Sequence, residues 1–93
     1  MDTDPAEPLS TSVQKISSDL IGVLDAAAAK QAGAHVSLVS ITIDVVGALG
    51  EGPFEFDTIV DRKTRTLVFI NARAVSGGVP VMTGTAVFSI QKD

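Results

Sequence analysis

The chain has 93 residues, of which 45% are hydrophobic and 19% charged, and its formal net charge is −4. This length is typical of one small domain, and the high apolar share predicts that part of the apolar surface is buried against another chain. The negative charge argues against nucleic acid as the main partner, because binding to phosphates needs a basic face.

The chain contains no cysteine and one histidine. Disulfides, thiolate nucleophiles and cysteine-ligated zinc are therefore excluded, and we expect no metal site and no bound cofactor. A reducing cytoplasmic location fits this composition best. The first residues lack the basic and apolar parts of a signal peptide, and no run approaches the roughly 18 apolar residues of a membrane span, so we expect neither export nor a membrane partner.

One long helix is predicted near the start of the chain. Residues 1–9 lack periodicity and are expected to form a flexible tail before a single domain over residues 10–93. The helix is expected to begin at Thr11, which forms a capping box with Gln14, and to end at Gly33. Its apolar stripe repeats every three or four residues and comprises Val13, Ile16, Leu20, Val23, Leu24 and Ala27.

After the helix the apolar pattern changes to a period of two, which predicts strands. The first strand begins at Val36 and is broken by the segment 47–53, and three more follow at residues 54–61, 66–75 and 81–90. The short turns at 61–65 and 76–78 predict an antiparallel meander. The fold class is therefore α+β, with one long helix wrapped by a curved antiparallel sheet of about four strands.

Both faces of the predicted sheet carry apolar residues. In the third strand Leu67 and Phe69 point one way, while Val68 and Ile70 point the other. An antiparallel sheet in water usually keeps one face polar. Either the leftover surface is used in assembly, or an edge strand extends across a dimer.

The helix face opposite the apolar stripe is unusual, because it carries small side chains around one acid. At about 100° per residue it comprises Ser18, Gly22, Asp25, Ala26 and Ala29. On one interpretation the alanines only favour the helix and Asp25 is a solvated charge. On the other, this face packs on a partner subunit that holds Asp25 at the contact.

The segment from Ile16 to Ile90 resembles the hotdog fold, in particular the small acyl-CoA thioesterases of the phenylacetate-pathway type. Ile16-Ser17-Ser18 occupies the place of that family's His-Gly-Gly, and LIGVLD supplies the helix with its Asp, here Asp25. The later segments SLVSITIDVV, FEFDTIVDRKTRTLVFINARAV and VPVMTGTAVFSI are similar to the family's last four strands. The His-Gly-Gly motif and the family's N-terminal strand are missing.

The resemblance implies a homodimer, or a larger even-numbered assembly, with Asp25 in a cleft between subunits. There Asp25 would act as general base or nucleophile on a coenzyme A thioester, the expected substrate, whose carbonyl is polarised by helix N-terminal amides. A helix that starts at Thr11, however, spends the amides of Ser17 and Ser18 on intrahelical bonds.

Other polar residues are candidates for binding the ligand. Arg62, Lys63 and Arg65 either form a solvated turn or bind the phosphate groups of a coenzyme A-like ligand. Asn71 and Arg73 line either a cleft or a solvent-exposed edge of the sheet. Thr83 and Thr85 flank Gly84, and a glycine inside a strand indicates a bulge, a bend or a close approach of another backbone.

Two further residues are assigned structural roles. Asp19 is expected to pair with Lys15 on the helix surface, and His35 to serve as a loop residue rather than a base. The sequence therefore leaves three functions open: an acyl-CoA thioesterase-like hydrolase, an inactive hotdog module for ligand binding or assembly, and, ranked lower because His35 is poorly placed, a dehydratase or hydratase.

Overall fold

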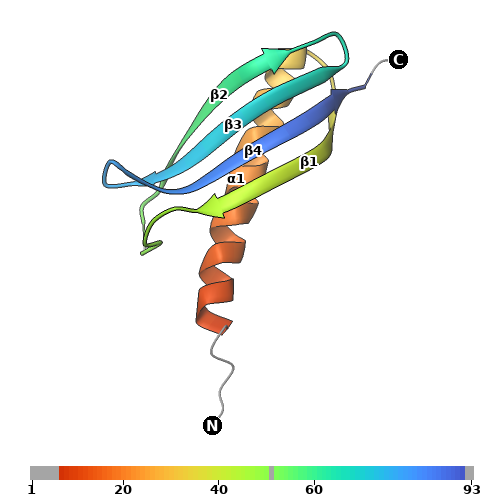
Figure 1. Cartoon of the computed structure of the whole chain (residues 1–93). Coiled ribbons are helices and arrows are strands. Elements are labelled where there is room, and N and C mark those ends of the chain that lie inside the picture. The colour runs from red at the N-terminus through yellow and green to blue at the C-terminus, as the bar shows by residue number, and fades with distance from the viewer. Residues whose placement is uncertain (1–6, 51, 92–93) are drawn as a thin grey trace.

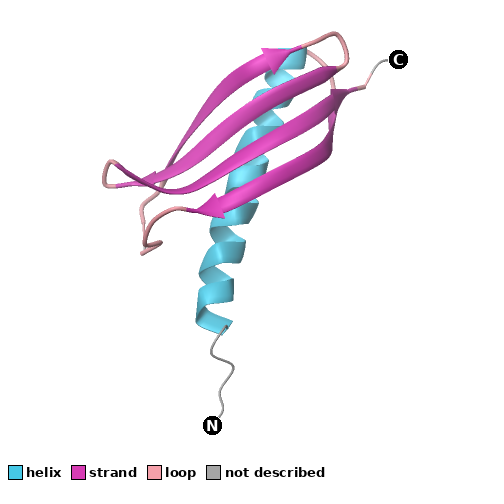
Figure 2. Cartoon of the chain, viewed as in Figure 1, coloured by secondary structure: helices cyan, strands magenta, loops and turns pink. Residues whose placement is uncertain are grey.

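The computed structural model describes residues 7–50 and 52–91 of the chain, with side chains from residue 13 onward. One helix packs against one face of a four-stranded antiparallel sheet (Figure 1; Figure 2). The elements in chain order are α1 (Glu7–Ala32), β1 (Val36–Val45), β2 (Glu55–Lys63), β3 (Leu67–Ser76) and β4 (Val79–Ile90). The predicted fold class is confirmed.

The strand order β1-β4-β3-β2 corrects the predicted meander. Strands β2, β3 and β4 do follow one another, and Gly77 and Gly78, both at positive φ, form the turn between β3 and β4. Strand β1, however, pairs with β4 instead of β2. A meander would have left β4 at an edge, although its Met82, Ala86 and Phe88 are almost fully buried. The observed order encloses this apolar strand between two neighbours.

The helix begins at Glu7, before the predicted start at Thr11. Pro8 is compatible with this start, because proline is tolerated in the first turn of a helix, where its missing N–H costs no hydrogen bond. Thr11 therefore lies inside the helix, and the predicted capping box does not mark its end. Of the expected tail, residues 7–9 are helical, and residues 1–6 lie outside the described part. The C-terminal prediction is confirmed: Gly33 has φ 65° and its N–H bonds to the Ala29 carbonyl.

The core lies between α1 and the central strands. The helix contributes Ile16, Leu20, Leu24 and Ala28, and β3 and β4 contribute Val68, Ile70, Ala72, Ala74, Val81, Met82, Ala86 and Phe88. Burying each large side chain of this set contributes about 1.5–3 kcal/mol relative to exposure. The predicted stripe is thus confirmed at Ile16, Leu20 and Leu24, while Val13, Val23 and Ala27 are only half-buried.

Gly84 in β4 allows the helix to approach the sheet closely. A Cβ at this position would lie 3.0 Å from Leu20 Cδ2 and 3.4 Å from Leu24 Cδ1. Of the roles predicted for this glycine, close approach is therefore the one observed.

Both outer strands of the sheet have an open edge. Strand β1 carries a register shift between Leu38 and Ser40, and β2 carries one between Val60 and Arg62.

Within the described residues, no helix is long and apolar enough to cross a membrane.

Candidate functional site

Asp25 lies on the face of α1 that points away from the sheet, as predicted. Its side chain is exposed, as are those of its helix neighbours Ser18 and Ala26. No hydrogen bond or ion pair joins Asp25 to another described residue. A Cβ placed on Gly22, one turn earlier, would meet nothing within 4 Å. The described part of the chain therefore leaves this carboxylate and the small side chains of Ser18, Gly22 and Ala26 uncovered.

The helix does not end near Asp25, which affects the predicted oxyanion site. At a rise of about 1.5 Å per residue, the first residue of α1 lies roughly 27 Å along the axis from Asp25. Ser17 and Ser18 are inside the helix, where their amides bond to carbonyls one turn back. Ser17 also turns toward the sheet and donates a hydrogen bond to Met82 Sδ at 3.7 Å. The amides at the position of the missing His-Gly-Gly are therefore not free to bind an oxyanion.

Four predicted ligand-binding residues lie on the sheet face opposite α1. Their neighbours Ala72, Ala74, Gly84 and Ala86 are buried beneath the helix, and side chains alternate along a strand. Asn71 faces Thr85 and Arg73 faces Thr83 across the β3–β4 pair. The structure thus groups Asn71, Arg73, Thr83 and Thr85, but the sheet separates them from Asp25 of the same chain.

These four residues are largely engaged in contacts with one another and with β2. Thr85 Oγ1 donates to Asn71 Oδ1 at 2.7 Å, and the Asn71 amide donates to the Asp61 carboxylate. Arg73 forms an ion pair with Asp57 at 2.9 Å, with both side chains about half exposed. Such a pair contributes about 0–1 kcal/mol. Sequence analysis missed Asp57 and Asp61, because their positions depend on the strand register and on the bulge that places Asp61 between Val60 and Arg62.

The predicted basic turn overlaps the end of β2, because Arg62 and Lys63 are the last residues of that strand and Arg65 lies in the turn to β3. Arg62, Lys63 and Arg65 are all exposed, and the turn is held by Thr64, whose hydroxyl oxygen accepts from the Leu67 amide at 3.0 Å. The Arg62 guanidinium lies 5.9 Å from the centre of the Phe69 ring, a cation–π geometry that fixes it on the helix-free face of the sheet. Lys63 and Arg65 remain available to a ligand.

Two surface hollows lie away from these residues. One is lined by Ala29, Gly33, Ala34, His35 and Gln91, at the C-terminal end of α1. His35 is exposed there, and its carbonyl accepts from the Gln91 amide at 2.9 Å, which fits the predicted loop role. Among the described residues, no carboxylate hydrogen-bonds or pairs with the His35 imidazole.

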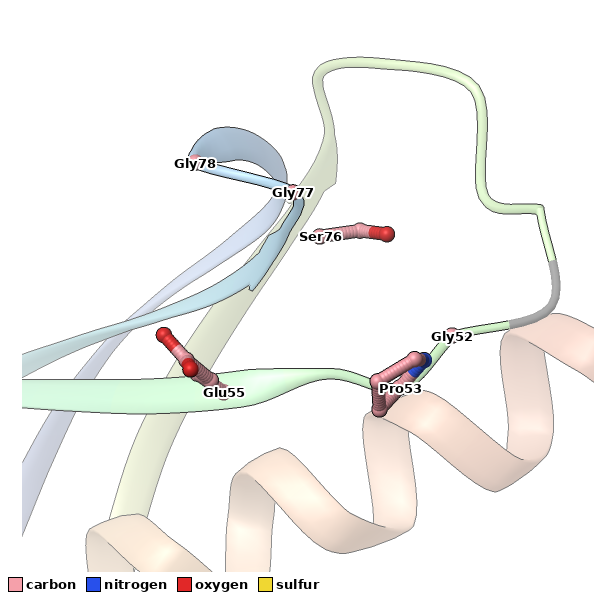
Figure 3. A pocket seen from close by; sticks show the side chains of 6 residues that line it. All are labelled: Gly52, Pro53, Glu55, Ser76, Gly77 and Gly78. Carbon is pink, nitrogen blue, oxygen red and sulfur yellow. The ribbon is translucent and has the colours of Figure 1, made fainter.

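The second hollow lies between the start of β2 and the β3–β4 turn (Figure 3). It is lined by Gly52, Pro53, Glu55, Ser76, Gly77 and Gly78. Among the described lining residues, Glu55 is the one ionisable residue, and no hydrogen bond joins it to Ser76, so they do not form a nucleophile paired with a base. Within the described residues, no group of three or more His, Cys, Asp or Glu side chains could hold a metal ion.

The fold is similar to that of three solved structures. A thioesterase-superfamily protein from Bordetella bronchiseptica is 22% identical, with a TM-score of 0.66, over 72% of this chain and 52% of that one. A phenylacetic acid degradation-related protein from Ralstonia eutropha JMP134 is 19% identical, with a TM-score of 0.59, over 62% and 44%. A conserved protein from Pseudomonas aeruginosa is 18% identical, with a TM-score of 0.57, over 61% and 46%.

The chain spans about half the length of these structures. At this low sequence identity, the structural similarity is evidence for a shared fold and not for a shared activity. No curated protein matches the sequence significantly. The family model of the acyl-CoA thioesterase N-terminal domain, in contrast, matches residues 20–89, which include Asp25 and all four strands. Because this match covers most of the chain, the protein belongs to the acyl-CoA thioesterase N-terminal domain family, with a hotdog-like fold.

Proposed function

We propose that two copies of this chain form a site that hydrolyses an acyl-CoA thioester, with Asp25 as the general base. The observation that carries the proposal is the exposed Asp25 on a helix face of small residues, inside the segment that matches the family. A carboxylate on such a face is accessible to water, and the small side chains around it let another backbone approach.

In this reaction Asp25 takes a proton from a water molecule, and the water oxygen attacks the thioester carbonyl carbon. The C–S bond then breaks, and the Asp25 carboxylic acid returns the proton to the leaving thiolate. Since the amides of Ser17 and Ser18 are bonded within α1, the donors that stabilise the oxyanion must come from the second copy. The site is therefore incomplete in one chain.

A contrast between the two open edges supports pairing of the copies through β1. The strand β2 carries charged Glu55, Asp57, Asp61, Arg62 and Lys63, and charges on an edge oppose pairing with another chain. Strand β1 carries one charge, Asp44. Most of the exposed large hydrophobic residues also lie on or directly after β1: Leu38, Val39, Val45 and Val46. We therefore propose an antiparallel β1–β1 contact in a homodimer.

The basic turn fits the nucleotide end of the substrate. The side chains of Lys63 and Arg65 are exposed. Although the whole chain has a net charge of −4, these two cations lie close together in sequence, and such a local positive charge favours binding of a phosphate group. By contrast, Asn71, Arg73, Thr83 and Thr85 lie behind the sheet from Asp25 of their own chain. They would contact substrate only if the assembly brought that face near another copy's helix.

The role of Asp25 is tested by measuring hydrolysis of acyl-CoA thioesters of different chain lengths. Asp25→Asn keeps the shape and removes the base, so we expect kcat to fall about 100- to 10,000-fold. Asp19→Asn, another exposed acid on α1, is the matched control and should retain activity. Undiminished turnover in Asp25→Asn would overturn the assignment.

A second function is a ligand-binding or assembly module without catalysis. The helix start at Glu7 favours this second function. Residues 16–18, at the position of the family's His-Gly-Gly motif, then lie inside the helix, and their amides are not free to bind a ligand. This function predicts no wild-type turnover with any thioester, together with self-association and saturable binding of coenzyme A. Turnover that depends on Asp25 would exclude it.

A further inference from the structure

The N-terminal part of α1 extends beyond the sheet. The first buried side chain of the helix among those described is Ile16, although the helix begins at Glu7 (Figure 1). In the figure this part of the helix projects past the β1 edge. We call residues 7–15 the clasp. The clasp precedes residue 20, where the match to the thioesterase family begins, so it is a feature of this chain beyond the matched domain.

The clasp is the first part of a 26-residue helix, and most of the stability of helices in proteins comes from packing of an apolar face. Val13 is half-buried against the chain's own core, and Gln14 and Lys15 are exposed. Of the clasp side chains that the structure describes, those of residues 13–15, Val13 alone packs against this core.

The same edge of the sheet has apolar side chains that the helix leaves uncovered. Leu38 pairs with Phe88 and Val45 pairs with Met82, and directly paired residues point to the same face of a sheet. Phe88 and Met82 are buried under α1, yet Leu38 is 45% and Val45 52% exposed. The helix side of β1 is therefore an apolar surface without a cover at both ends of the strand.

We propose that the clasp packs on the helix side of β1 in a second copy of this chain, over Leu38. This inference rests on the β1–β1 contact of the proposed function, but not on hydrolysis. Adding a second β1 extends the sheet beneath the projecting helix, and two-fold symmetry repeats the contact in the other direction. The clasp is roughly 13 Å long at about 1.5 Å per residue, enough to reach across about two strands spaced at about 4.8 Å.

A second copy fits this surface because each chain has both parts of the contact at the same edge of its sheet: the projecting clasp and the uncovered helix side of β1. A projecting helix lacks a sheet beneath it, and an edge strand lacks a helix above it. An unrelated partner would have to supply both features in the same arrangement. The β1 strand also carries only Asp44 as a charge, so the contact requires no charge pairing.

Sedimentation equilibrium of full-length variants tests the clasp. Leu38→Lys places a charge on the helix side of β1, and Leu38→Met, which keeps this side chain apolar, is its control. In the clasp, Thr11→Pro interrupts the helix before the first buried residue, and Thr11→Ala preserves it. We expect Leu38→Lys and Thr11→Pro each to weaken dimerisation about tenfold or more relative to its control, with the circular dichroism of a folded helical protein retained.

Wild-type affinity in both Leu38→Lys and Thr11→Pro would overturn the clasp. A wild-type chain that stays monomeric at all concentrations would overturn it together with the dimer. Weakened dimerisation in both variants supports the clasp even if no thioester is hydrolysed, since in that case only the catalytic proposal fails. The controls separate the clasp from a general loss of folding, because Leu38→Met and Thr11→Ala change the same two residues without adding a charge or interrupting the helix.

Discussion

On α1, the face toward the sheet carries Leu20 and Leu24, both without exposed surface, whereas the opposite face carries Gly22 and Asp25, both exposed. The sheet side achieves close contact because Gly84 of β4 leaves space for the two leucines. The opposite side has its own glycine, but no described residue lies within 4 Å of a Cβ at Gly22. Gly84 already has its close neighbours, and Gly22 has none among the described residues.

This contrast indicates how the protein is completed. A helix face normally presents long charged side chains to water when nothing covers it. Here the uncovered face keeps small residues around one acid, which is the composition that a close protein contact requires. The comparison therefore predicts that changes on the sheet side affect folding, and that changes on the opposite side affect association.

The largest effect is expected for Gly84→Val on the sheet side. The added side chain meets Leu20 and Leu24, which have no room to move in a packed core, so the free energy of unfolding should fall by about 1–3 kcal/mol. Urea unfolding measures this change. Thr83→Val, on the other side of the same strand, is the control and should change stability by less than about 0.5 kcal/mol. Equal stability of the two variants would show that the helix is not held as closely as described.

A smaller effect of mixed sign is expected for Gly22→Ala on the opposite face. Alanine favours a helix interior over glycine by about 0.5–1 kcal/mol, so the monomer should become more stable. If a partner backbone lies against Gly22, the added methyl group should also weaken dimerisation. Unfolding and sedimentation of the same variant measure both quantities. A more stable chain that dimerises as tightly as wild type would place the contact elsewhere.

The smallest effect is expected for the surface pair between Lys15 and Asp19, whose charged atoms are 4.0 Å apart. Both side chains are more than half exposed, so Asp19→Asn should lower the free energy of unfolding by only a few tenths of a kcal/mol. High salt should remove the difference between the variant and wild type. A loss above about 1 kcal/mol would mean that Asp19 makes a contact beyond this pair.

Local patterns predicted the elements well, because each depends on nearby residues. The helix stop at Gly33, the turn at Gly77 and Gly78 and the spacing of Ile16, Leu20 and Leu24 are all readable over a few positions. The helix start was predicted too late, because the capping box at Thr11 was taken as the start, whereas the helix already begins at Glu7. The strand order was wrong because turn lengths favoured a meander, while burial of β4 between two neighbours is decided by the whole sheet.

The candidate site was predictable only in part. The helical period placed Asp25 correctly on the face away from the sheet. The contacts on the helix-free face of the sheet could not be predicted from the sequence. Those of Asn71 with Asp61 and Thr85 depend on the pairing of separate strands and on a bulge in β2. No local pattern encodes such a bulge. For Asn71 and Arg73 the sequence therefore left a cleft and a solvent-exposed edge open, and their carboxylate partners were not predicted.

The central claim is that a second copy covers what this chain leaves open, and the molar mass of the wild-type protein tests it most directly. Sedimentation equilibrium from low micromolar concentration upward should give twice the mass of the chain. A single-chain mass across that range would contradict the claim, because Asp25 and Gly22 would then face only water.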